Sequence, residues 1–179
     1  AKYYEKSRTN IVGYQTYVIT SPSLSTLQSL TQLLVKNNIQ VTQLKQADAN
    51  FKAYDYNTKS ENLYKNEGYH IVVEANQAHG VLASVLLEPV TQVNDSNTYD
   101  ITSWSLPYAY GVHGYATKEK LPTQPLTALA PISVESTSYG YAIPYNSLTQ
   151  AKLLAALLQK GIKVRYAEKA FSNGNKSFE

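Results

Sequence analysis

The sequence predicts an α/β domain in which helices pack on a mostly parallel or mixed sheet. Two related strand-helix-strand units support this prediction, because such a unit usually joins parallel strands by a right-handed crossover. The 179 residues are 43% hydrophobic, which is enough for the sizeable core of such a domain. Only 16% are charged, against roughly 25% in an average globular domain.

An amino-terminal arm, residues 1–13, precedes the first unit at about 14–44. Its first strand is predicted at 14–19, where the composition is typical of a strand and a Thr-Ser-Pro-Ser turn follows. Asn37 and Asn38 can adopt the left-handed conformation that ends a helix, and the alternation at 39–44 predicts a second strand. The intervening helix is predicted from leucines at helical spacing, which are Leu24, Leu27, Leu30, Leu33 and Leu34.

A second unit, at about 139–166, repeats the first. Seven residues match at constant displacement: Tyr141, Ile143, Ser147, Leu148, Leu157, Leu158 and Lys160 correspond to Tyr17, Ile19, Ser23, Leu24, Leu33, Leu34 and Lys36. After a one-residue deletion Gly161 replaces the Asn pair, and Ile162 and Val164 match Ile39 and Val41. Ser147 and Gln150 predict a capping box at the helix start. We interpret this agreement as an internal repeat rather than a chance similarity of two generic units.

A third strand and helix are predicted between the repeats. Residues 68–75 have strand character, Asn76 can cap the following helix, and Pro89 ends it. Residues 51–57 predict a short edge strand, and 90–138 are mostly loop, which is long enough to need ordering by packing or by a partner. We expect one domain over 14–171 and a tail at 172–179. The apolar stripe of the helix is predicted to be Ala78, Val81, Leu82, Val85 and Leu86.

The composition excludes several classes of function. Without Cys there is no disulfide framework, thiolate metal site or cysteine nucleophile. The net charge of +3 gives no nucleic-acid footprint, and no apolar run approaches the roughly 18 residues that span a membrane. The Gly-x-Ser-x-Gly elbow of serine hydrolases is absent. Since the chain starts at Ala1 and has no Met, we expect a processed or excised piece of a longer protein.

The histidines leave a metal site open as an alternative. His70 and His79 flank the turn between the third strand and its helix, and Glu74 shares the strand face of His70. The helical His-Glu-x-x-His pattern is absent. We therefore interpret these histidines as ordinary residues at the ends of elements, and predict no metal site and no cofactor in this chain.

A cluster of aromatic residues gives the candidate contact surface. Its members either fill the core, form a protein or domain interface, or provide a ligand platform. Asp100 and Thr102 are expected to fix the loop that carries them. Of the aromatic residues in this stretch, the candidate interface or binding residues are Tyr99, Trp104, Tyr108 and Tyr110.

Three segments resemble a known family. GYHIVVEANQ at 68–77, LLEP at 86–89 and YDITSWSLPYAYGV at 99–112 resemble the region that follows the catalytic domain in large exported zinc carboxypeptidase-type proteins of Bacteroidetes-like bacteria. Asn76-Gln77 stands where that family often has Asp-Gln. LLQKGIKVRYAEKAF at 157–171 is similar to a later part of the same region, so the resemblance covers about 14–171.

The resemblance implies a non-catalytic accessory domain with an amidotransferase-like fold, in a secreted or periplasmic bacterial protein. The family's His-x-x-Glu zinc signature is absent, so no catalytic residue carries over and zinc is expected only in the missing catalytic domain. The partners that the resemblance implies are that catalytic domain and, through it, a peptide substrate. The alternatives are a free-standing carbohydrate- or peptide-binding module, and an enzyme built on His70, His79 or Glu74. A further strand is expected after the second repeat, which predicts an incomplete sheet edge.

Overall fold

The computed structural model describes residues 13–90, 105–127, 136, 139–143, 145, 147–173 and 176–178. The chain divides into two compact units, residues 1–130 (unit 1) and 131–179 (unit 2). Within the described ranges, no helix is long and apolar enough to cross a membrane. The prediction of one domain over 14–171 stays a prediction.

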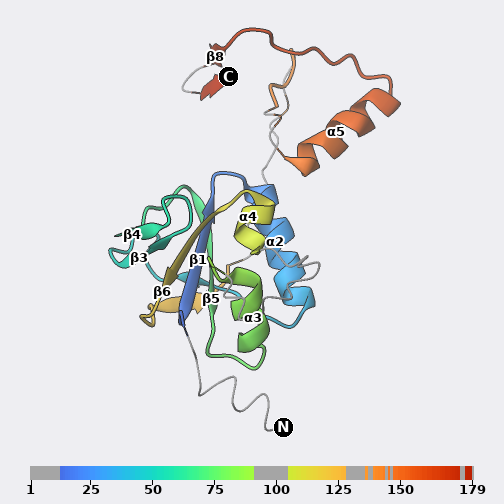
Figure 1. Ribbon diagram of the computed structural model, residues 1–179. Coiled ribbons are helices and arrows are strands. Elements are labelled where there is room, and N and C mark those ends of the chain that lie inside the picture. Colours follow the sequence, from blue (N-terminus) through green and yellow to red (C-terminus); the bar gives the residue numbers. More distant parts are fainter. Residues whose placement is uncertain are drawn as a thin grey trace, which may run out of the picture. The chain divides into compact units, whose positions relative to one another are not determined.

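Unit 1 is built on a seven-stranded sheet in which every pairing is antiparallel (Figure 1). The strand order is β4-β3-β6-β1-β5-β2-β7. The strands are β1 (Thr16–Ser21), β2 (Thr42–Leu44), β3 (Lys52–Asp55), β4 (Ser60–Leu63), β5 (Tyr69–Glu74), β6 (His113–Thr117) and β7 (Thr123–Pro125). The described residues of this unit also form the helices α2 (Leu24–Lys36), α3 (Gly80–Leu87) and α4 (Leu106–Tyr110).

The prediction of a mostly parallel or mixed sheet was therefore wrong. Strands β1 and β2 run in the same direction, but β5 lies between them and pairs antiparallel with both. The central side chains of β5 explain this position, since Ile71, Val72 and Val73 point alternately to both faces and all have 0% exposure. A strand that is apolar on both faces buries more surface in the centre of a sheet than at its edge.

The four central strands form two interleaved split β-α-β units. The first unit, β1-α2-β2, encloses β5, and the second, which runs from β5 through α3 and α4 to β6, encloses β1. The β3–β4 hairpin extends the sheet beyond β6. Each split unit leaves a gap between its strands that only the other unit fills, so neither half can form this sheet alone.

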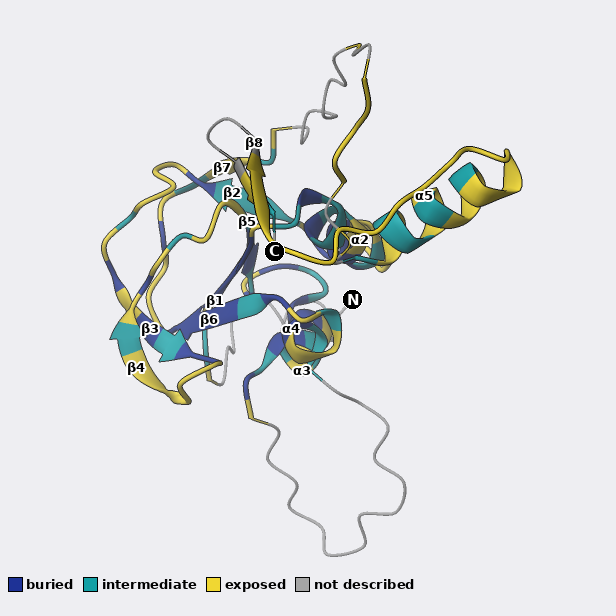
Figure 2. Ribbon diagram, turned by 90° about the horizontal axis from the view of Figure 1, so that it is seen from above, coloured by how far each residue is buried: buried dark blue, intermediate teal, exposed yellow. Residues whose placement is uncertain are grey.

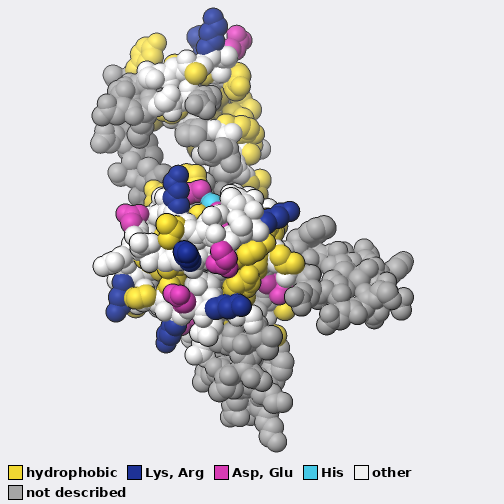
Figure 3. Space-filling view, turned by 60° about the vertical axis from the view of Figure 1, so that its left-hand side comes forward, with side chains coloured by type: hydrophobic (Ala, Val, Ile, Leu, Met, Phe, Trp, Pro, Cys, Tyr) yellow, Lys and Arg dark blue, Asp and Glu magenta, His cyan; other side chains and the backbone are white. Residues whose placement is uncertain are grey.

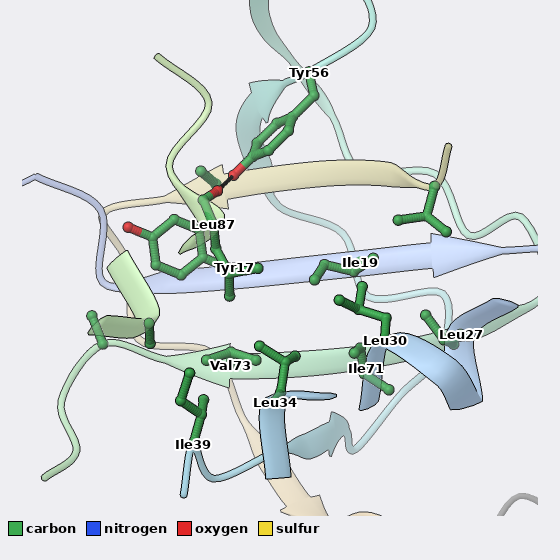
Figure 4. Close-up of a cluster of buried hydrophobic side chains, with 14 residues drawn as sticks. Tyr17, Ile19, Leu27, Leu30, Leu34, Ile39, Tyr56, Ile71, Val73 and Leu87 are labelled. Carbon is green, nitrogen blue, oxygen red and sulfur yellow. Dashed lines mark hydrogen bonds between the residues drawn. The ribbon is translucent and has the colours of Figure 1, made fainter. Parts of the chain in front are cut away.

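The core lies on both sides of the sheet. The helices cover one face, where Tyr17 and Ile19 of β1 meet Leu27, Leu30 and Leu34 of α2 (Figure 4). The other face carries a second cluster made by the strand residues Val18, Leu44, Val72 and Tyr115 with Phe51, which directly precedes β3. Each of the three buried leucines contributes on the order of 1.5–3 kcal/mol through burial, so this contact fixes α2 on the sheet.

The predicted limits of α2 are confirmed. Its N-cap residue Ser23 accepts a hydrogen bond from the Thr26 amide at 3.4 Å, and Asn38 adopts a left-handed φ of 57° just after the helix. Four of the five predicted leucines are buried, namely Leu24, Leu27, Leu30 and Leu34. The local signals in this sequence therefore specify the helix and its inward face.

Unit 2 contains α5 (Leu148–Gln159) and a hairpin of β8 (Phe171–Asn173) and β9 (Lys176–Phe178). The helix of the second repeat is present, but residues 139–143 and 162–166, where the repeat predicts strands, are not strands. None of the described residues of this unit is buried, and Figure 2 shows α5 without buried residues. The expectation of two complete strand-helix-strand units was therefore wrong, since a strand needs a neighbouring strand to satisfy its backbone groups.

Candidate functional site

The predicted aromatic surface is described only in part. Tyr99, Asp100, Thr102 and Trp104 lie outside the described residues. Tyr108 and Tyr110 lie on α4, a short helix with Pro107 in its first turn and Gly111 in the left-handed conformation after it. The structure therefore places two of the four candidate interface residues on one helix.

These two tyrosines differ in their surroundings. Tyr110 is partly buried against the core, whereas Tyr108 is 44% exposed. The Tyr108 hydroxyl is within hydrogen-bond distance of two carbonyl oxygens, that of Tyr56 at 3.3 Å and that of Pro89 at 3.4 Å. Partial burial, together with the nearby Tyr54 and Asp55, raises the pKa of this phenol. Its ring is thus held in place while one side stays open to a partner.

Three of the larger apolar side chains of helix α3, those of Val81, Leu82 and Val85, face solvent, contrary to the sequence prediction. The side chains that face the core are Gly80, Ala83 and Leu87, with Leu86 partly buried. Of the predicted inward stripe, Val81 is 43% exposed, Leu82 37% and Val85 47%. The predicted orientation was wrong because every residue of α3 except Ser84 is apolar or glycine, so periodicity does not select a face.

The start of α3 also differs from the prediction. The N-cap is His79 rather than Asn76, and it makes no capping side-chain hydrogen bond. The helix is held at its other end, where the Tyr56 hydroxyl donates a hydrogen bond to the Leu87 carbonyl oxygen (Figure 4). Burial raises the pKa of Tyr56 well above its ordinary value, so the phenol stays protonated and remains a donor.

The exposed part of α3 and the neighbouring Tyr108 form one candidate contact surface. Helices α3 and α4 contact each other, and the ring centroids of Tyr56 and Tyr108 are 5.5 Å apart. We call this surface the α3–α4 face and define it as Val81, Leu82, Val85, Val90 and Tyr108. Contiguous apolar surface of this kind on a folded domain is typical of protein interaction sites.

A second candidate is a polar cluster between β3, β6 and the loop before β5. The His113 Nε2 lies 2.7 Å from Asp55 Oδ1, and its Nδ1 lies 2.9 Å from Glu67 Oε1. The imidazole also stacks on Tyr115, with ring centroids 4.4 Å apart. Figure 3 shows acidic and basic side chains interspersed over this side of the unit.

The electrostatics of this cluster favour a structural role. Burial raises the pKa of the Asp55 carboxyl, but hydrogen bonds from His113 and from the Asn57 and Thr58 amides outweigh burial and hold the pKa below its ordinary value. Both ring nitrogens of His113 are paired with carboxylates. This arrangement holds the imidazole between the two carboxylates, and the cluster ties the hairpin to β6.

Sequence reasoning missed this cluster. Asp55, Glu67 and His113 lie far apart in the chain and follow no spacing motif. They come together because β3 pairs with β6, where Tyr54 is opposite Ala116 and Asp55 is opposite Tyr115. Only the strand order, which local patterns do not encode, would have revealed it.

The histidines considered for metal binding lie elsewhere in unit 1. Glu74 accepts a hydrogen bond from the Thr123 hydroxyl at 2.9 Å. Burial lowers the pKa of His70, and its Nε2 is buried without a hydrogen-bond partner. Among the residues that the structure describes, no group of three or more His, Cys, Asp or Glu side chains is arranged to hold a metal ion.

Comparison with known proteins gives no relative: no family profile, curated protein sequence or solved structure matches the chain significantly. The interpretation of both surfaces therefore depends on the geometry of this chain.

Proposed function

We propose that this chain is a non-catalytic accessory module that docks on another protein domain through the α3–α4 face. The observation that carries the proposal is the orientation of α3, which places Gly80 and Ala83 against the core and leaves Val81, Leu82 and Val85 at the surface. The small residues let the helix pack closely on the core, while these three larger side chains remain free to contact a partner.

The energetics support docking on a protein. Contact with a partner removes the exposed valine and leucine side chains from water, which is favourable because their surface is apolar. Tyr108 adds a ring that is already positioned by its hydroxyl contacts, so little rotamer entropy is lost on binding. Tyrosine is enriched in such interfaces.

From the family resemblance, the partner we propose is the catalytic domain of an exported zinc carboxypeptidase-type protein, with the whole assembly secreted or periplasmic. In this arrangement the module either stabilises the catalytic domain or helps to present its peptide substrate. Zinc and the hydrolytic residues belong to the partner, and this chain supplies the contact surface.

The test is a titration of the purified chain into such a zinc carboxypeptidase catalytic domain, measured by calorimetry. We expect binding that Val85→Asp weakens by at least about tenfold, equivalent to about 1.4 kcal/mol. Leu63→Asp is the matched control, because Leu63 is 59% exposed on β4, outside this face. The proposal fails if the unmodified chain does not bind, or if both variants bind like it.

A second candidate function is the binding of a sugar or peptide to the open ring of Tyr108, which is 44% exposed. A small-ligand site would depend on this ring but not on the outer surface of α3. Titration with peptidoglycan fragments therefore distinguishes the two functions: Tyr108→Ala should abolish such binding, whereas Val85→Asp should leave it unchanged.

A further inference from the structure

Unit 2 reproduces the local structure of the first half of unit 1. Helices α2 and α5 start after a serine whose hydroxyl accepts an amide hydrogen bond at 3.4 Å, Ser23 in α2 and Ser147 in α5. They also end alike. The Ile39 amide donates to the Leu34 carbonyl oxygen at 3.0 Å, and the Ile162 amide donates to the Leu157 carbonyl oxygen at 3.0 Å.

The residue before each of these isoleucines is left-handed, with φ of 57° at Asn38 and 69° at Gly161. The matched helix ends show where the one-residue deletion falls. Helix α2 has 13 residues and α5 has 12, and Lys160 is the C-cap of α5 while its counterpart Lys36 lies inside α2. The deletion therefore shortens the helix and leaves its closing turn intact.

The hairpin that follows is also repeated. In unit 1, Phe51 and Tyr64 stack at the base of the β3–β4 hairpin, with ring centroids 4.8 Å apart and an interplanar angle of 13°. In unit 2, Phe171 and Phe178 stack across β8 and β9 at 4.9 Å and 11°. The order of elements from β1 to β4 therefore has a counterpart in unit 2, although the residues matching β1 and β2 are not strands.

Burial separates the two units. The residues of unit 1 that match the repeat are covered by β5, which pairs with all six residues of β1, and by the packed helices. The described part of unit 2 offers no such strand. The exposed fractions are 2% for Tyr17 and 59% for Tyr141, 1% for Ile19 and 46% for Ile143, and 2% for Ile39 and 48% for Ile162.

We propose that unit 2 is the first half of a second domain with the unit 1 fold, and that it binds a strand-helix-strand polypeptide segment of the β5–α3–β6 kind. The strand of this segment inserts between residues 139–143 and 162–166, pairs antiparallel with both, and carries apolar side chains on both faces. Its helix packs beside α5, as α3 accompanies α2 in unit 1. The interaction surface is thus an open sheet position together with the apolar side of α5.

The chemistry of residues 139–143 favours such a segment over a second copy of unit 2. In β1, Val18 is fully buried on the face of the sheet opposite the helices, next to Val72 of β5. The corresponding residue of unit 2 is Ala142, and Gly140 corresponds to Thr16. If two copies of unit 2 paired through this stretch, the glycine and alanine of one copy would lie opposite those of the other. The face of the sheet opposite the helices would then have no large side chains to bury. A strand like β5 supplies them.

The experiment supplies a β5–α3–β6 segment in cis. Residues 64–127 are appended directly after Glu179, which reproduces the short connection between β4 and β5. Amide hydrogen exchange is then measured at residues 141–143 and 162–166 in the original and the extended chain. We expect exchange at these positions to slow by at least about tenfold in the extended chain, while the extended chain stays monomeric by light scattering.

Matched variants make the result specific. Leu157→Asp, at the position that corresponds to Leu34 in the closing turn, should abolish the gained protection, whereas Gln159→Asp, at an exposed position nearby, should not. Both positions lie in unit 2 and neither is buried in the original chain, so neither variant should disturb unit 1. Unchanged exchange in the extended chain overturns the proposal. It is also overturned if the original chain already protects these residues as a dimer, because a second copy would then be the occupant.

Discussion

Helices α2 and α5 start and end with the same hydrogen bonds, yet they differ in what surrounds them. Helix α2 buries Leu24, Leu27, Leu30, Thr31 and Leu34, whereas no described residue of α5 is buried. Caps and spacing therefore specify where a helix starts and stops, but a helix gains most of its stability from an apolar partner surface. The partner surface in unit 1 is the sheet completed by β5 and β6.

The largest expected difference concerns matched core leucines. Leu30→Ala should reduce the free energy of unfolding of unit 1 by about 2–5 kcal/mol, because the side chain is fully buried and leaves a cavity. Leu154→Ala, at the matching position of α5, should change it by less than about 0.5 kcal/mol. Urea denaturation measures both. An equal loss in the two variants would mean that α5 is already packed.

A second pair compares two glycines. A Cβ at Gly114 would lie 2.6 Å from the Tyr56 ring, which is buried and held by its bond to Leu87, whereas a Cβ at Gly140 meets nothing within 4 Å. Gly114→Ala should therefore destabilise unit 1 by about 1–3 kcal/mol. Gly140→Ala should be neutral within about 0.5 kcal/mol. Thermal unfolding distinguishes them, and a neutral Gly114→Ala would show that Tyr56 can move.

A smaller effect is expected at the helix caps. Ser23→Ala should cost about 1 kcal/mol in the global unfolding of unit 1, since it removes the acceptor for an amide at the start of a packed helix. Ser147→Ala should leave that transition unchanged and reduce only the helical circular dichroism signal of α5. A shift of the global transition by Ser147→Ala would link α5 to the core of unit 1.

The weakest effect concerns pH. Because the folded pKa of Asp55 lies below its ordinary value, its contribution to stability is present above the unfolded pKa of about 3.9 and is lost as the pH falls through the folded value. Asp55→Asn should therefore flatten the acid limb of the stability profile of unit 1. Urea midpoints at several acidic pH values measure this, and an unchanged slope would contradict the role of the cluster.

The local features of this fold were predictable from the sequence, and the long-range ones were not. Ser23, Asn38 and the leucines of α2 act within one or two turns, so their pattern predicts the helix correctly. The position of β5 between β1 and β2 depends on pairing between residues that are distant in the chain. The two-residue alternation of apolar side chains along a strand does not show which strands pair. The parallel crossover was predicted from the order of elements alone.

The candidate site divides in the same way. Exposure of Tyr108 on α4 agrees with its selection as a contact residue, while Tyr110 packs against the core. The outward face of α3 could not be predicted, because an almost wholly apolar helix has no polar side that would mark the face toward solvent. In the structure, the small residues Gly80 and Ala83 lie against the core. The His113 cluster is a consequence of strand order.

Native-state hydrogen exchange of the chain tests the central claim most directly, namely that β5 and β6 cover the first repeat in unit 1, whereas the matching residues of unit 2 have an open position for such strands. The account predicts that the amides of α2 exchange only through global unfolding of unit 1, while those of α5 exchange through local opening at a free energy close to zero. Protection of α5 equal to that of α2 in the monomeric chain would contradict the account.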